Sequence, residues 1–260
     1  MKKIIALMMV VALTALCFAG CGGSAEKIIV AEKGSAGETV AMEIEGYEYT
    51  AVDTQAKALM EVSAGTADAA VVDYVMSIGS IGEGTDYENL VVSGDGYAPE
   101  NYGIAFRKGS DFTAKVNEVI AELKADGTLD RIGKTYKLDE LIAADATFDA
   151  FSKAETDSDY DYIMNKGELI IGITYFAPMN YKDDSGKLVG FETEFAEAVC
   201  AKLGIKAKFV EINWNSKETE LAAKNIDCIW NGMTITEERQ ENMSITIPYM
   251  QNKQVMIVKK

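Results

Sequence analysis

The chain has 260 residues, enough to bury either one large hydrophobic core or two modest ones. Its formal net charge of −16 argues against nucleic-acid binding, which needs clustered basic residues to displace counterions. Histidine is absent, which removes the usual metal ligand and excludes Ser-His-Asp and Cys-His catalysis. Any catalysis would have to use carboxylates, lysine or tyrosine.

The first twenty residues predict a secretory signal peptide. Lys2 and Lys3 precede an apolar run over 4–18 that is too short to span a bilayer. The small residues before Cys21 resemble the lipobox of bacterial lipoproteins, in which such a cysteine is acylated. We therefore expect cleavage before Cys21 and a lipid anchor that holds the chain outside the cytoplasmic membrane. The alternative is an ordinary signal peptide with an incidental cysteine.

The residues that follow have the pattern of an α/β lobe. A β-rich run at 27–32 leads into a glycine loop at 34–37, which opens a helix. A second helix, with Asp53 as its expected cap, ends at Gly65. The apolar run in the strand at 68–73 indicates burial on both faces, as in a parallel sheet covered by helices. Another strand at 102–108 and two helices complete this half.

The second half, from 161 on, alternates strands and helices in the same way. Strands are expected at 169–172, 207–210, 227–230 and 254–258, and helices around 191–203 and 217–223. A helix, a tight turn, an Asp and an apolar strand occur at 59–73 and again at 221–231, as two similar lobes would produce. Cys200 and Cys228 occupy apolar positions, which favours buried free thiols over a disulfide. The acidic stretch at 141–160 is predicted to be a linker with some helical content.

Polar residues stand where open α/β sheets bind ligands, at the carboxyl ends of strands. Asp73 ends an apolar strand, and a buried carboxylate there needs a cation such as a ligand ammonium group. Thr236 is expected to cap a helix that carries Arg239 in its first turn, where a cation opposes the helix dipole. Such an arginine is suited to gripping an external carboxylate. The loop at Ser35 offers amides and a hydroxyl to a small anion.

Each of these features also has a plainer explanation. Arg239 is otherwise a solvated surface residue, and Asp73 is otherwise a helix cap or paired within the protein. The loop at Ser35 lacks the Gly-Lys-Ser/Thr ending of a nucleotide-binding loop, so it is a weak signal alone.

Several stretches of the sequence resemble the polar amino-acid-binding proteins of ABC importers, family 3 of the bacterial solute-binding proteins. In the second half these are 175–181, 186–191 and 227–239 followed by 245–249, and in the first half 34–35, 67–73, 103–108 and 123–132. The resemblance implies an α/β fold of the two-lobed, type II periplasmic-binding-protein class, with a ligand cleft between the lobes.

The resemblance also implies roles for matching residues. Arg239 would bind the ligand α-carboxylate with help from Thr234 and Ser35, and Asp73 would bind the α-ammonium group. Phe176 matches the aromatic residue that stacks on the ligand.

Further residues are expected in the same cleft. Trp214 matches a tryptophan of the Arg239 lobe, and Asn231, Gly232 and Tyr181 would line the pocket of that lobe. Where the family has a second hydroxyl after the loop glycine, this chain has Ala36, so one contact is expected to be missing.

The two halves stand in the reverse of the family's order, which we interpret as a circular permutation with its joint in the acidic linker. The expected organisation is a signal peptide at 1–20, a tether at 21–26, the Asp73 lobe at 27–103, a crossover strand and helices packing on the Arg239 lobe at 104–140, the linker at 141–160, the Arg239 lobe at 161–252 and a second crossover strand at 253–260. The rival account is a fragment of a longer tandem protein.

The expected function is capture of a free amino acid and its delivery to an ABC permease, without enzymatic activity, metal or cofactor. We expect a neutral polar ligand side chain, because the Arg239 lobe offers aromatic and amide groups but no obvious acid. Two alternatives remain: a sensory or interaction module with the same cleft, and an exported dehydratase on the same fold.

Overall fold

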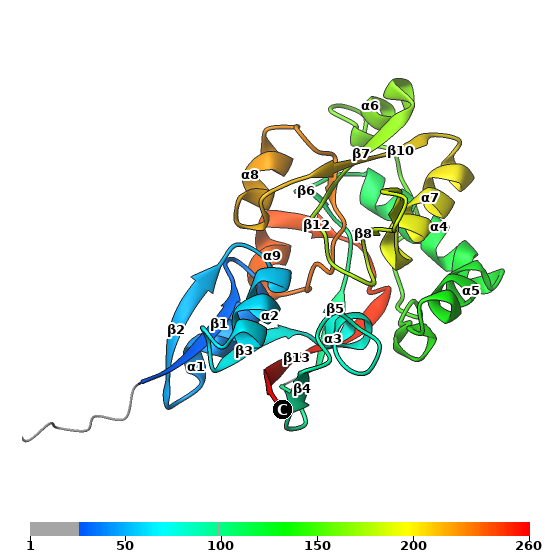
Figure 1. Ribbon diagram of the computed structural model, residues 1–260. Coiled ribbons are helices and arrows are strands. Elements are labelled where there is room, and N and C mark those ends of the chain that lie inside the picture. The colour runs from blue at the N-terminus through cyan, green and yellow to red at the C-terminus, as the bar shows by residue number, and fades with distance from the viewer. Residues whose placement is uncertain (1–25, 98) are drawn as a thin grey trace, which may run out of the picture.

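The computed structural model describes residues 26–97 and 99–260, which form two α/β lobes joined by long strands (Figure 1). The predicted signal peptide, Cys21 and nearly all of the tether fall within residues 1–25, outside the described part. Among the described residues, no helix combines the length and the apolar character needed to cross a membrane.

The Asp73 lobe is built on a sheet in the order β2-β1-β3-β13-β4. Its strands are β1 (Lys27–Glu32), β2 (Tyr47–Val52), β3 (Ala69–Asp73), β4 (Leu90–Ser93) and β13 (Met250–Lys259). Its helices are α1 (Ala36–Glu43), α2 (Gln55–Ala64) and α3 (Tyr74–Ser80). Every residue of β3 is buried, with Val71 in the apolar cluster of α1 and Val72 in that of α2. The expected burial of this strand on both faces is confirmed.

The Arg239 lobe is built on a second sheet, in the order β10-β7-β11-β6-β12. Its strands are β6 (Ala105–Arg107), β7 (Glu168–Ile173), β10 (Lys206–Glu211), β11 (Cys228–Ile229) and β12 (Met243–Ile245), and a small hairpin adds β8 (Tyr181–Lys182) and β9 (Leu188–Val189). Its helices are α4 (Phe112–Ala125), α5 (Thr128–Thr135), α6 (Asp159–Lys166), α7 (Phe191–Leu203), α8 (Lys217–Ala222) and α9 (Glu237–Asn242), with the 3-10 turns η1 (Asp139–Leu141) and η2 (Trp214–Ser216). Cys200 and Cys228 are buried free thiols, as expected.

Both sheets follow one plan. The Asp73 sheet has β2, β1 and β3 side by side, and the Arg239 sheet has β10, β7 and β11 in the equivalent places. In each sheet, a strand from a distant part of the chain then separates the third of these strands from the last one, β4 or β12. The intervening strand is β13 in the Asp73 lobe and β6 in the Arg239 lobe, and each runs antiparallel to its neighbours. The repeated helix, turn and strand seen in the sequence correspond to α2–β3 and α8–β11, one in each lobe.

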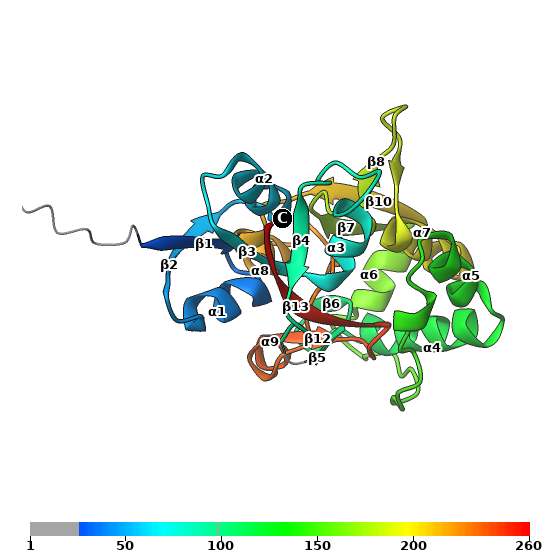
Figure 2. The ribbon, with the colours of Figure 1, turned by 60° about the horizontal axis from the view of Figure 1, so that its bottom comes forward.

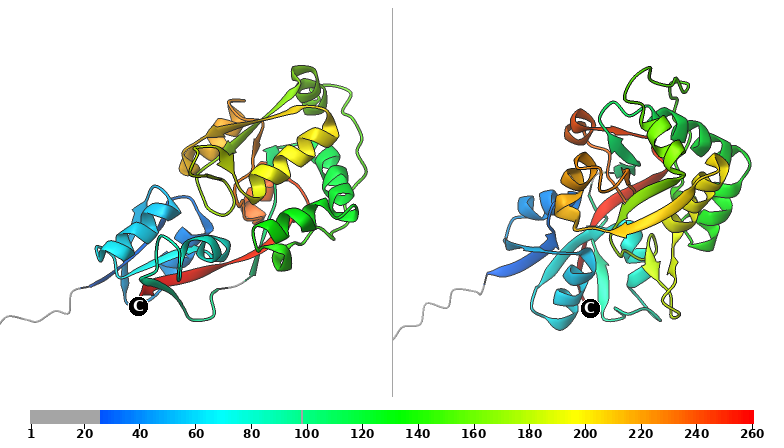
Figure 3. Two further views of the ribbon diagram at one scale, coloured as in Figure 1. Left: turned by 45° about the vertical axis from the view of Figure 1, so that its right-hand side comes forward. Right: turned by 90° about the horizontal axis from the view of Figure 1, so that it is seen from above.

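Two antiparallel strands connect the lobes. The first half of β13 pairs with β5 (Pro99–Tyr102), and its second half then enters the Asp73 sheet (Figure 2). The chain leaves β5 directly into β6 of the other sheet, so the two connections lie side by side (Figure 3). The expected strand at 254–258 lies within β13, which begins earlier, at Met250.

The linker differs from expectation, because it contains no helix between 142 and 158. It lies on the Arg239 lobe instead. The Phe151 ring packs 4.8 Å from that of Tyr160, measured between centroids. The amide of Ala154 and the hydroxyl of Ser158 both donate to Asp111, at 3.0 and 2.6 Å. Helix α2 also differs in detail, since Thr54 and not Asp53 is its cap.

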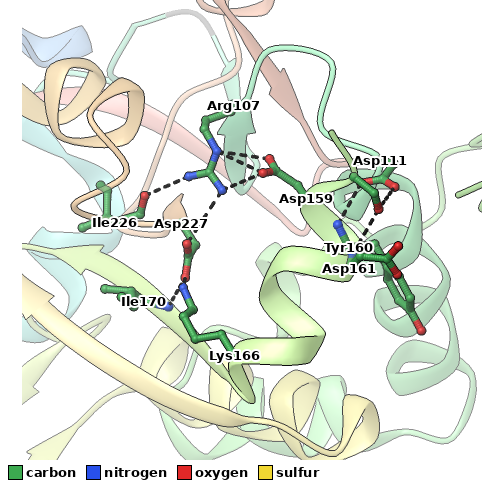
Figure 4. Close-up of polar contacts among 10 residues, drawn as sticks. Arg107, Asp111, Asp159, Tyr160, Asp161, Lys166, Ile170, Ile226 and Asp227 are labelled. Atoms are coloured by element: carbon green, nitrogen blue, oxygen red, sulfur yellow. Dashed lines mark hydrogen bonds and ion pairs between the residues drawn. The ribbon is translucent and has the colours of Figure 1, made fainter. Parts of the chain in front are cut away.

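A cluster of charged residues attaches α6, where the linker ends, to the sheet (Figure 4). Arg107 of β6 donates from Nη2 to Asp159 at 2.9 Å and from Nη1 to the carbonyl of Ile226 at 3.1 Å. The fully buried Asp227 lies 3.7 Å from Arg107 Nη2 and accepts from Lys166 Nζ at 2.5 Å. Strand β6, helix α6 and the turn before β11 are thereby held together.

Candidate functional site

A narrow cavity, with room for about one water molecule, lies between the two lobes. From the Asp73 lobe it is lined by Glu32, Ser35, Ala36, Gln55 and Asp73, and from the Arg239 lobe by Trp214, Asn231, Gly232, Thr234 and Arg239. The structure therefore brings most of the predicted site residues together across one space. Phe176 and Tyr181 are the predicted residues that do not line it.

Arg239 reaches the cavity from the start of α9. The Thr236 side chain caps this helix by accepting from the Arg239 amide at 3.2 Å, as the sequence predicted. The guanidinium donates from Nη1 to the carbonyl of Thr234 at 2.8 Å and from Nη2 to the carbonyl of Gly34 at 3.3 Å. Since Gly34 belongs to the opposite lobe, Arg239 contacts both sides of the cavity.

Asp73 is 5 % exposed at the end of β3, and amide side chains surround its carboxylate. Oδ1 accepts from Asn252 Nδ2 and Gln254 Nε2, each at 2.6 Å, and Oδ2 accepts from Gln55 Nε2. Burial raises the pKa of Asp73 above its usual value. A carboxylate has about four lone-pair sites, so one on Oδ2 remains for another donor.

Sequence reasoning missed these three amides, although a signal was present. Asn252 and Gln254 alternate on one face of β13, and Gln254 stands opposite Asp73 in the strand register. The pairing of β13 with β3 links residues about 180 positions apart, so no local pattern shows it.

The loop before α1 meets two cations of the other lobe at the Gly34 carbonyl. This oxygen accepts from Lys217 Nζ at 3.0 Å as well as from Arg239. Gly34 has a φ of +75°, and a Cβ there would lie 3.3 Å from Asn215, so glycine suits both the turn and the close approach. The Ser35 hydroxyl caps α1, accepting from the Glu38 amide at 3.1 Å and donating to the Glu32 carbonyl at 2.7 Å.

Lys217 was not predicted, and it is almost fully buried beside the cavity. Its Nζ also donates to the Trp214 carbonyl at 3.3 Å and lies 4.7 Å from the centre of the Trp214 ring. Burial, and then the nearby charge of Arg239, lower the pKa of Lys217 to about 8.

Under the cavity, a buried polar network holds the loop after β11. The Asn231 side chain accepts from the Thr174 amide and from Asn180 Nδ2, both at 3.0 Å, so it positions the loop as well as lining the cavity. Gly232 has a φ of +58°, and a Cβ there would lie 2.8 Å from the Phe176 ring. Phe176 thus packs beneath the loop, outside the cavity.

Glu192, another residue missed from the sequence, supports the same loop. Its Oε1 accepts from the Gly232 amide at 2.7 Å and from the Tyr249 hydroxyl, and its Oε2 accepts from Asn180 Nδ2 at 2.7 Å. Burial raises its pKa to about 7. The sequence places Glu192 in the first turn of α7, but acidic residues are generally favourable there, so this position alone does not indicate a role in the site.

Residues 169–260 match the model of the bacterial extracellular solute-binding proteins, family 3. This part of the chain is similar to that family. The two lobes have the type II periplasmic-binding-protein fold, and the matched residues cover the Arg239 lobe from β7 onward together with β13.

Relatives within and around family 3 match over part of their length. The L-cystine-binding protein TcyJ of Escherichia coli (strain K12) is 33% identical over 34% of this chain and 33% of its own. A probable amino-acid ABC transporter-binding protein of Haemophilus influenzae is 33% identical over 46% of each chain. The arginine-bound form of domain 1 from TmArgBP is 31% identical, over 38% of this chain and 86% of that one, with a TM-score of 0.34. The chain thus spans about a quarter to just under a half of the length of the curated relatives it matches.

Two of the predicted contact residues, Phe176 and Tyr181, lie outside the lining of this cavity. Phe176 is 3 % exposed and contacts the underside of the Gly232 loop. Tyr181 lies half-buried in the β8–β9 hairpin, which is outside the cavity lining. Among residues 26–97 and 99–260, no group of three or more Cys, Asp or Glu side chains could hold a metal ion.

Proposed function

We propose that this protein is an extracytoplasmic solute-binding lipoprotein that captures a free amino acid by lobe closure and delivers it to an ABC permease. One observation carries the proposal: the guanidinium of Arg239 and the carboxylate of Asp73 line the same interlobe cavity from opposite lobes. A free amino acid carries the complementary pair of charges, an α-carboxylate and an α-ammonium group, at fixed separation.

The proposed binding mode follows from these two groups. Arg239 uses two guanidinium nitrogens on backbone carbonyls, and its remaining N–H donors are available to an α-carboxylate. Asp73 keeps one acceptor site on Oδ2 for an α-ammonium group. Thr234 adds a hydroxyl, which donates to Glu100 at 3.3 Å.

Lobe closure is supported by the division of the site. A ligand held by Arg239 alone contacts one lobe, and adding Asp73 requires the other to approach. The contacts of Lys217 and Arg239 with the Gly34 carbonyl show that the two lobes touch in this conformation.

Binding without turnover, the lipid anchor at Cys21 and the permease partner rest on relatives and on sequence. The curated relatives include binding proteins named for cystine, histidine and octopine, two of them called periplasmic. These names cover chemically different ligands, so they select no side chain. The neutral polar side chain expected from the sequence stays a prediction. It was inferred from the residues of the Arg239 lobe only.

Truncation of Arg239 tests the proposal. We expect Arg239→Ala to weaken amino-acid binding by roughly 2–5 kcal/mol, because it removes the cation that pairs with the buried α-carboxylate of the ligand. Isothermal titration calorimetry with a panel of amino acids measures the effect. Arg131→Ala removes an exposed arginine of α5 and serves as the control. Unchanged affinity in Arg239→Ala would contradict the assignment of the carboxylate site.

A further inference from the structure

Glu32 is a buried carboxylate of the interlobe cavity, and one of its two oxygens lacks a hydrogen-bond partner in the described part of the chain. It is the last residue of β1, it lines the cavity, and it is only 4 % exposed. Its Oε1 accepts no hydrogen bond from any described residue, and no described lysine or arginine forms an ion pair with it. A buried acceptor of this kind needs a donor, and the cavity is the open side.

The two charged groups of the amino-acid backbone do not need Glu32. On the proposed function, Arg239 takes the α-carboxylate and Asp73 takes the α-ammonium group. Glu32 is then a third charged group in the same cavity, available to the ligand side chain. Its strand pairs with β3 in the register Ala31 to Val71, so Glu32 and Asp73 stand at the same edge of the sheet.

The charges of the cavity wall favour a cation at this place. Two carboxylates, Glu32 and Asp73, and one guanidinium, Arg239, line it. An amino acid with a neutral side chain balances Arg239 and Asp73 and leaves Glu32 either as an unbalanced buried carboxylate, which is unfavourable, or as a protonated carboxyl. A cationic side chain balances all three.

Lys217 does not supply the missing cation. Its Nζ donates to the carbonyls of Gly34 and Trp214, and it lines the outer groove between the lobes and not this cavity. Its charge acts on Glu32 from a distance, without an ion pair among the described contacts.

We propose that Glu32 determines specificity by binding the positively charged side chain of a basic amino acid. This inference rests on the proposed function and narrows its ligand class. It departs from the neutral polar side chain expected from the sequence, because the acid comes from the Asp73 lobe and not from the lobe that carries Arg239.

The proposal has a pH signature. Burial, and then the nearby Asp73, raise the pKa of Glu32 to about 8, so at pH 6, without a cationic ligand, this carboxyl holds a proton. A cationic side chain displaces that proton, so affinity rises from pH 6 to pH 8, by at most about tenfold per pH unit. Other charged groups adjoin Glu32: Asp73 and Arg239 in the cavity, Lys217 in α8, and Glu38, which accepts from the Gly34 amide. Comparison with a Glu32→Gln variant shows how much of the pH dependence of affinity is due to Glu32.

Calorimetric titration of the purified protein with L-lysine, L-arginine, L-glutamine and L-alanine at pH 6, 7 and 8 tests this inference. We expect a basic amino acid to bind tightest, Glu32→Gln to weaken it roughly 30-fold or more, and the rise with pH to vanish in that variant. Glu48→Gln makes the same charge change on the exposed face of β2 and is the matched control. The pH dependence of ligand affinity in the wild-type protein tests the inference even if a variant fails to fold.

The outcomes separate this inference from the proposed function. Tightest binding of L-glutamine or L-alanine would overturn the role of Glu32 and leave amino-acid capture standing. A basic ligand bound equally well by Glu32→Gln, with the same pH dependence, would also overturn it. No heat with any amino acid, at any pH, would contradict the proposed function itself.

Discussion

Some side chains of the site can be predicted from the sequence, because they stand at the end of a strand or the start of a helix. Others join the site only through contacts made in the folded sheet. Asp73 and Arg239 were predicted because each follows a recognisable element, an apolar strand and a capped helix. Glu32 also ends a strand, but nothing in the sequence distinguishes it from a solvated acid. Gln55 and Gln254 enter the site through contacts with Asp73 that join distant parts of the chain.

Glu192 leads to a prediction about pH and stability. Its pKa is raised from 4.5 to about 7 in the folded protein, so between these values the folded state binds more protons than the unfolded state. The free energy of unfolding therefore falls as pH rises from about 5 to 8. We expect this contribution to be of the order of 1–3 kcal/mol.

Urea unfolding of wild type and Glu192→Gln at pH 5, 6, 7 and 8 measures this effect. The variant cannot titrate at this position, so its stability should depend less on pH than that of the wild type. An identical pH dependence in both proteins would show that Glu192 does not hold the proton.

At the scale of elements, the buried strands and long helices were predictable, whereas short and exposed elements were not. Strand β3 has an uninterrupted apolar run, and α7 has apolar residues on one face, so both periodicities are clear. Strand β2 lies at a sheet edge and has no buried residue, and it was missed. The linker lacks the helix expected of it because its contacts are tertiary, to Asp111 and Tyr160.

The attachment of α6 gives a prediction at this scale. Arg107→Ala leaves the buried carboxylates of Asp159 and Asp227 without their shared cation. We expect it to lower the free energy of unfolding by roughly 3–5 kcal/mol, as for other broken buried ion pairs. Lys153→Ala breaks a pair with Asp161 in which both side chains are about half exposed, and it should leave stability nearly unchanged. Equal effects in chemical denaturation would contradict the role given to Arg107.

At the scale of the whole molecule, each lobe depends on a strand that comes from a distant part of the chain. The Asp73 sheet includes β13, and the Arg239 sheet includes β6, so neither lobe is a continuous segment. The order of the lobes, with Asp73 before Arg239, is the sequence observation behind the circular permutation, which stays a prediction. Sequence motifs predicted both lobes, but the facing of Asp73 and Arg239 depends on how β5 and β13 pair.

The central claim is that the two lobes of one chain complete one amino-acid site. Light scattering coupled to size-exclusion chromatography, followed by titration of the monomer peak with free amino acids, tests it most directly. We expect a monomer that binds one amino acid per chain, with Asp73 and Arg239 both required. A monomer that binds none, or binding confined to a dimer, would contradict it and favour pairing of these lobes with other chains.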